Sequence, residues 1–102
     1  MKVLVVCPLG VVSHWEKEFK LWLPGETFKS LNVSEVNSCK NKKERRKIFE
    51  RWRQLGGIMI IEYELFRSLT KEVKNRSEQD LFYYQSLVNP GPDVLFGGTI
   101  LN

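Results

Sequence analysis

The stretch Val3-Leu4-Val5-Val6-Cys7-Pro8 decides the fold class of this 102-residue chain. It is a continuous apolar, largely β-branched run that ends at proline, which is typical of a strand buried on both faces of a parallel sheet. Ile58-Met59-Ile60-Ile61 has the same character, and Val94-Leu95-Phe96 predicts a further short strand. Helical patterns stand between these runs. The sequence therefore predicts an α/β fold, a parallel sheet flanked by helices.

The helical patterns have recognisable boundaries. The first begins near Ser13, whose side chain can cap the free amides while Glu16 completes a capping box, and it ends before Pro24-Gly25. The spacing of apolar residues predicts the other elements in the same way. These are a short strand over residues 28–36, helices over 42–55 and 79–88, a helix or helical turn over 63–69, and an exposed connection over 70–80.

Aromatic residues of the predicted helices, Trp15, Phe19, Trp22 and Trp52, allow two interpretations. Nucleic-acid bases stack on exposed aromatic rings, whereas rings at helical spacing on an apolar face pack in a core. Because the spacing here is helical, we expect all of them on internal faces.

Composition limits the class of protein. With 42% hydrophobic and 12% aromatic residues, the chain has enough apolar material for the core of one ordinary domain. Its apolar runs are far shorter than the roughly 18 residues of a membrane span, and the first is too short for a secretion signal. Cys7 and Cys39 form neither a CxxC pair nor a disulfide framework. We therefore expect a reducing compartment and no membrane partner.

The charge is concentrated in one element. The formal net charge is +4, but residues 40–53 hold eight basic and two acidic residues, so the rest of the chain is slightly acidic. One interpretation is a solvated helix face opposite Ile48, Phe49 and Trp52. The other is a contact with a polyanion. The candidate residues for that contact are Lys42, Lys43, Arg45, Arg46 and Lys47.

Independent catalysis finds little support among the residues. His14 is the only histidine, so a serine or cysteine nucleophile has no other base, and one histidine with two separated cysteines does not build a metal site. The phosphate-binding Gly-x-x-x-x-Gly-Lys-Ser/Thr loop is absent. Residues 8–13 are of more interest, because a loop between a parallel strand and a helix is a common place for ligands. Its amides would favour an anion such as a DNA phosphate.

Several stretches resemble the motifs of a known family. Leu4-Val5-Val6-Cys7-Pro8-Leu9, followed by Trp15-x-x-Glu18-Phe19-x-x-Trp22, resembles motif Ia and the helix after it. Gly56-Gly57-Ile58-Met59-Ile60-Ile61 and Tyr63-Glu64-Leu65-Phe66-Arg67 are similar to the strand and segment of motif Ib, and Leu87-Val88-Asn89-Pro90-Gly91-Pro92-Asp93 to the approach to motif II. In this order, over nearly the whole chain, they resemble the Swi/Snf-type chromatin-remodelling ATPases of helicase superfamily two, most closely the ATRX/XNP branch.

The resemblance implies that residues 1–102 are part of the N-terminal RecA-like lobe of a nuclear DNA translocase. It implies ATP and Mg²⁺ as cofactors of the full-length parent, ATP-driven stepping along duplex DNA, and DNA, chromatin and the rest of the ATPase lobe as partners. It further implies nonspecific contacts between the DNA backbone and the motif Ia loop and motif Ib. In this chain those residues are Pro8, Leu9, Gly10, Val11, Tyr63 and Glu64.

Departures from the family pattern bear on activity. The P-loop motif that precedes motif Ia in the family is absent, and Gly97-Gly98-Thr99-Ile100-Leu101-Asn102 stands where motif II would read Asp-Glu-Gly/Ala-His. Glu62 stands where the family usually has a small residue, which bears on how closely motif Ib can approach a phosphate. We therefore expect no catalytic residue, no cofactor and no ATP hydrolysis in this chain alone.

Other interpretations stay open. We interpret the chain as an interior slice of a longer lobe, since it starts at the motif Ia strand and stops beside its last strand. Alternatively, it is a non-enzymatic module that binds nucleic acid or an acidic protein through the basic helix over residues 40–53. It can also be a nonfunctional truncated product that does not fold stably.

Overall fold

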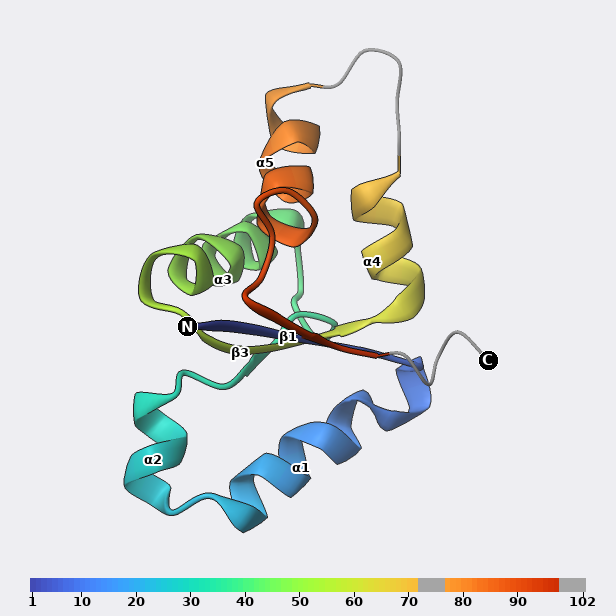
Figure 1. Cartoon of the computed structure of the whole chain (residues 1–102). Coiled ribbons are helices and arrows are strands. Elements are labelled where there is room, and N and C mark those ends of the chain that lie inside the picture. Colours follow the sequence, from blue (N-terminus) through green and yellow to red (C-terminus); the bar gives the residue numbers. More distant parts are fainter. Residues whose placement is uncertain (72–76, 98–102) are drawn as a thin grey trace.

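Residues 1–71 and 77–97, which the computed structural model describes, form a four-stranded parallel sheet with helices on both faces (Figure 1). The strands, in spatial order, are β2 (Ser34–Glu35), β3 (Gly57–Glu62), β1 (Lys2–Cys7) and β4 (Val94–Phe96). The helices α1 (Val12–Trp22) and α2 (Gly25–Ser30) cover one face, and α3 (Lys42–Leu55), α4 (Tyr63–Thr70) and α5 (Glu78–Leu87) cover the other. The predicted α/β class is confirmed. Among the described residues, no helix is long and apolar enough to span a membrane.

The central strands β1 and β3 determine both cores. They pair in parallel, from Lys2 opposite Gly57 to Cys7 opposite Glu62. Because side chains alternate along a strand, β1 and β3 pack against helices on both faces, which explains their continuous apolar runs. One core joins Leu4, Val6, Met59 and Ile61 to Phe49, Trp52, Tyr83 and Leu87, and the other joins Val5, Cys7, Ile58 and Ile60 to Val12.

The tryptophans do not share one environment. Trp52 is fully buried, and its indole N–H donates to the Gly57 carbonyl oxygen at 3.1 Å, as a core residue should. The prediction is wrong for Trp15 and Trp22, whose exposed fractions are 37% and 77%. Helix α1 is the outermost layer on its side of the described fold (Figure 1), so only its sheet-facing side, including Phe19, is packed.

The predicted capping box at Ser13 is also wrong. Residues Leu9–Val11 form a short 3-10 helix, η1, which runs directly into α1, and the Val12 N–H donates to the Leu9 carbonyl oxygen. This turn carries the chain into the helix with Val11 at the N-cap and no side-chain cap. A capping box occurs instead at α5, where Ser77 Oγ accepts from the Asp80 N–H and the Asp80 carboxylate accepts from the Ser77 N–H, each at 3.1 Å.

The predicted strand over residues 28–36 is mostly absent. Residues Gly25–Ser30 are helical, and strand pairing is confined to Ser34–Glu35, opposite Met59 and Ile60. Pro24 at the N-cap and Glu26 in the first turn favour this helix start. The predicted connection over residues 70–80 is too long at both ends, because α4 includes Thr70 and α5 begins at Glu78. Residues 72–76 lie outside the described residues.

A test of this packing is available at Gly57. Its φ is +106°, and a Cβ there would lie 2.1 Å from the Leu31 carbonyl oxygen. Backbone strain and this close approach both oppose a side chain, so Gly57→Ala should lower the free energy of unfolding by about 3 kcal/mol or more in urea denaturation. Gly25→Ala is the matched control, because a Cβ at Gly25 meets nothing within 4 Å. Equal stability of the two variants would contradict the packing described.

Candidate nucleic-acid interface

The carboxyl ends of β1 and β3 bring two distant segments of the chain together. Cys7 and Glu62 are paired at the last position of the register, so the residues that follow them leave the sheet side by side. They line a hollow of about 420 Å³, which we call the strand-end hollow. Its lining residues are Pro8, Leu9, Glu62, Tyr63 and Glu64.

The structure places the predicted backbone-contact residues in three settings. Pro8, Leu9, Tyr63 and Glu64 lie together at the strand-end hollow. Gly10 is exposed, with nothing within 4 Å of the position a Cβ would take, so its backbone is open to a close approach. Val11 is half-buried and packs against the core formed by β1, β3 and α1, so less of its surface is open to a ligand.

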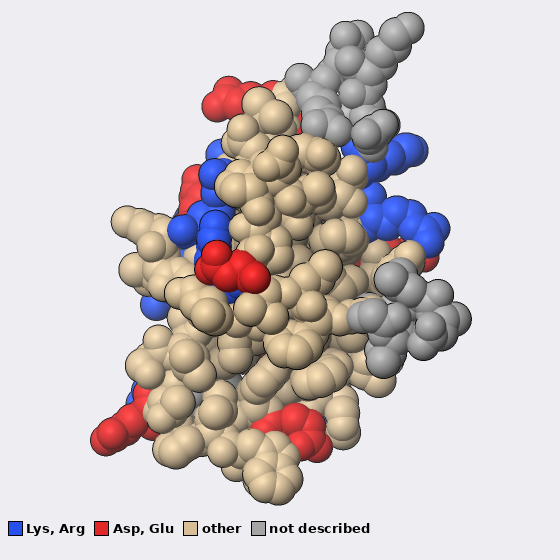
Figure 2. All heavy atoms as spheres, in the orientation of Figure 1, with Lys and Arg blue, Asp and Glu red and all other residues tan. Residues whose placement is uncertain are grey.

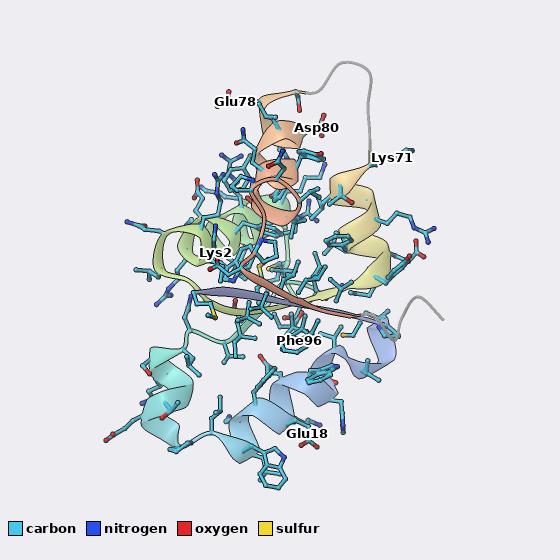
Figure 3. All side chains as sticks on the ribbon, in the orientation of Figure 1. Lys2, Glu18, Lys71, Glu78, Asp80 and Phe96 are labelled. Carbon is cyan, nitrogen blue, oxygen red and sulfur yellow. The ribbon has the colours of Figure 1, made fainter. Side chains whose placement is uncertain are left out.

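Positive charge next to this hollow comes from α4. The Arg67 guanidinium lies 5.0 Å from the centre of the Tyr63 ring, and its Nη1 is 3.9 Å from Glu64 Oε1. A hydrogen bond with the Tyr63 side chain, and then the Glu64 carboxylate, raise the pKa of Arg67. A second hollow of about 540 Å³ continues along α4 past Arg67 to Lys71, which lies at the end of the helix away from the sheet (Figure 3).

Arg67 and Lys71 are not among the contact residues predicted from the sequence. A usable signal was present, because Arg67 is four residues and Lys71 eight residues after Tyr63, so all three fall on one side of a helix that begins at Tyr63. Without the helix boundary, that spacing could not be assigned to a surface.

The basic residues of α3 fall into two sets, one that packs against α5 and one that is exposed to solvent. Arg46 lies 3.6 Å and Arg53 5.0 Å from the centre of the Phe82 ring, and Arg45 lies 5.6 Å from the Tyr83 ring. These guanidinium groups pack α5 against α3 and are half-buried. The exposed basic residues of the helix are Lys42, Lys43, Lys47 and Arg51, and Figure 2 shows Lys and Arg gathered over α3 and α4 on two sides of the molecule.

Groups that could do chemistry lie apart from one another. The buried Cys7 thiol has its pKa raised to about 11, chiefly by burial and further by the Glu62 carboxylate, so it is protonated at neutral pH. His14 is exposed on α1, and its Nε2 is 3.6 Å from Glu18 Oε1. Within residues 1–71 and 77–97, no group of three or more His, Cys, Asp or Glu side chains is placed to hold a metal ion.

Comparison with known proteins finds relatives that match most of this chain. Transcriptional regulator ATRX of Mus musculus is 43% identical over 95 residues, which cover 90% of this chain and 4% of that protein. The chain is ATRX-like. The ATRX homolog of Caenorhabditis elegans is 37% identical over 111 residues (92% of this chain, 8% of that protein). Protein CHROMATIN REMODELING 20 of Arabidopsis thaliana is 30% identical over 95 residues (90% of this chain, 6% of that protein).

The resemblance to Swi/Snf-type remodelling proteins thus extends over 90% or more of the ATRX-like chain. The chain spans less than a tenth of the length of these relatives. No family model matches the sequence, and no solved structure matches it.

The division of α3 predicts different consequences for neighbouring basic residues. Arg46→Ala removes a guanidinium that packs on Phe82, so it should lower the free energy of unfolding by about 1 to 2 kcal/mol. Lys47→Ala, at an exposed position of the same helix, should change it by no more than about 0.5 kcal/mol. Thermal denaturation followed by circular dichroism measures both values. If Lys47→Ala lowered the free energy of unfolding as much as Arg46→Ala, the distinction between packed and exposed basic residues of α3 would be wrong.

Proposed function

We propose that this chain belongs to the first RecA-like lobe of an ATRX-type, ATP-driven DNA translocase and supplies part of its grip on the DNA backbone. The observation that carries the proposal is the β1–β3 register, which places the residues after Cys7 beside those after Glu62. The resemblance assigns both segments to DNA contact, and their proximity lets them engage one stretch of backbone. A nuclear location follows from the same proposal.

Contact at this surface would be with phosphates and not with bases. The open backbone at Gly10 allows a phosphate oxygen to approach closely, and Arg67 and Lys71 provide the positive charge along α4. Such contacts hold a duplex independently of its sequence, as a protein that tracks along DNA requires.

Nucleotide hydrolysis is not proposed for these 102 residues alone. ATP and Mg²⁺ would be bound in the parent by a P-loop lysine and an Asp-Glu pair, and the sequence contains neither motif. The proposed role of the chain is therefore to bind DNA.

The apolar surface around β4 fits a place inside a larger lobe. β4 is an edge strand of the described sheet, with Leu95 59% and Phe96 53% exposed. A hollow of about 350 Å³ is lined by both Phe96 and Trp15 of α1. Figure 2 shows few charged side chains on the face of the molecule that is turned toward the viewer. Since parallel sheets are normally covered on both faces and protected at their edges, we propose that the rest of the ATPase lobe packs here.

A second candidate function rests on α3. Lys43, Lys47 and Arg51 are exposed and four residues apart, so they form one positive stripe on the helix. A module that binds nucleic acid or an acidic protein through this stripe would need no translocase. Binding to DNA would then be abolished by charge reversal of the stripe and unaffected by changes at α4.

The α4 contact can be tested with the purified chain and a fluorescent DNA duplex. The double variant Arg67→Gln with Lys71→Gln removes two proposed phosphate contacts, so binding should weaken about tenfold or more and the slope of log K against log salt should decrease by about 2. The double variant Lys17→Gln with Lys20→Gln removes the same charge from exposed positions of α1. If both doubles weaken binding equally, only net charge matters and the proposed contact is wrong.

A further inference from the structure

Glu62 is held in a fixed position between two elements at the strand-end hollow. Its backbone N–H, at the end of β3, donates to Asn37 Oδ1 at 2.8 Å. Its carboxylate Oε2 accepts from the Leu65 N–H at 3.0 Å, so Glu62 is the N-cap of α4. The first bond fixes the backbone of Glu62, and the second holds its carboxylate at the start of α4, beside the hollow that the residue lines.

The Glu62 carboxylate lies at the N-terminus of α4, where the helix would attract a bound anion most strongly. The free N–H groups of the first turn and the helix dipole attract negative charge at a helix N-terminus. Glu62 already supplies that charge from within the chain, and it lies beside the Pro8 and Leu9 segment. Its field reaches the end of β1, since the pKa of Cys7 is raised first by burial and then by the Glu62 carboxylate.

Glu64 does not have the same effect. Its side chain is 72% exposed and lies 3.9 Å from the Arg67 guanidinium, so solvent and salt screen its charge. Among the described residues that line the strand-end hollow, Glu62 is therefore the fixed negative charge without a cationic partner.

We propose that Glu62 is a negative determinant of DNA affinity, which holds the N-terminus of α4 closed to a phosphate and so weakens the grip at the strand-end hollow. This inference rests on the proposed DNA contact and adds that Glu62 limits the affinity of that contact. The open backbone at Gly10 and the basic side chains of α4 attract the DNA backbone, and Glu62 repels it between them. A translocase that must release each phosphate before the next step gains from such a limit.

The test is the affinity of Glu62→Gln for the same DNA duplex. The glutamine oxygen can still accept from the Leu65 N–H, so the variant removes the charge while keeping the cap. Binding should tighten about three- to tenfold at roughly 50 mM salt, and the gain should shrink as salt rises to about 300 mM. A purely structural role would not produce this salt dependence. Glu62→Thr, which caps a helix without charge, should behave alike and serves if the glutamine variant does not fold.

The matched control is Glu26→Gln, which removes the same charge from the first turn of another helix, α2. It should change affinity by less than about twofold. If Glu62→Gln binds no tighter than this control while the Arg67 and Lys71 double variant still binds weakly, the inference about Glu62 is overturned and the proposed function stands. If the unaltered chain does not bind DNA, both are overturned.

Discussion

Parallel pairing of β1 with β3 is the constraint on which the rest of the structure depends. The register from Lys2 and Gly57 to Cys7 and Glu62 places alternate side chains of both strands in two cores. The same register fixes which residues leave the sheet together. A shift of one residue would turn the apolar side chains of one strand to the other face and would change which residues meet at the strand ends, so packing and the candidate interface have one origin.

The positive charge available at the interface depends on which basic side chains already pack against other parts of the fold. Arg46 and Arg53 pack on Phe82 and stabilise the contact between α3 and α5, so their charge serves stability as well as the surface field. Arg67 stacks on Tyr63 but keeps a 63% exposed side chain at the edge of the candidate interface. The number of charged residues in a sequence segment is thus a poor guide to where it binds DNA. Which of those side chains stack on rings or cap helices is decided by tertiary structure.

Much of the fold could be predicted from local pattern, and the failures have physical causes. The strands at residues 3–6 and 58–61 and the helix over 42–55 follow from strong apolar periodicity. Ser13 fails as a cap because a 3-10 turn enters the helix first. Trp22 fails as a core residue because periodicity shows that a helix has an apolar face and not whether another element covers it. The candidate residues at the strand ends were predictable from the family resemblance, whereas Arg67 and Lys71 required the position of α4.

The most direct test of the central claim is an NMR titration of the ¹⁵N-labelled chain with a short DNA duplex. We expect the largest amide shifts to occur together at Leu9, Gly10, Tyr63 and Glu64, which lie in two segments remote in sequence that follow the ends of β1 and β3. Shifts confined to the exposed face of α3, around Lys43 and Lys47, or the absence of any localised shift, would contradict it.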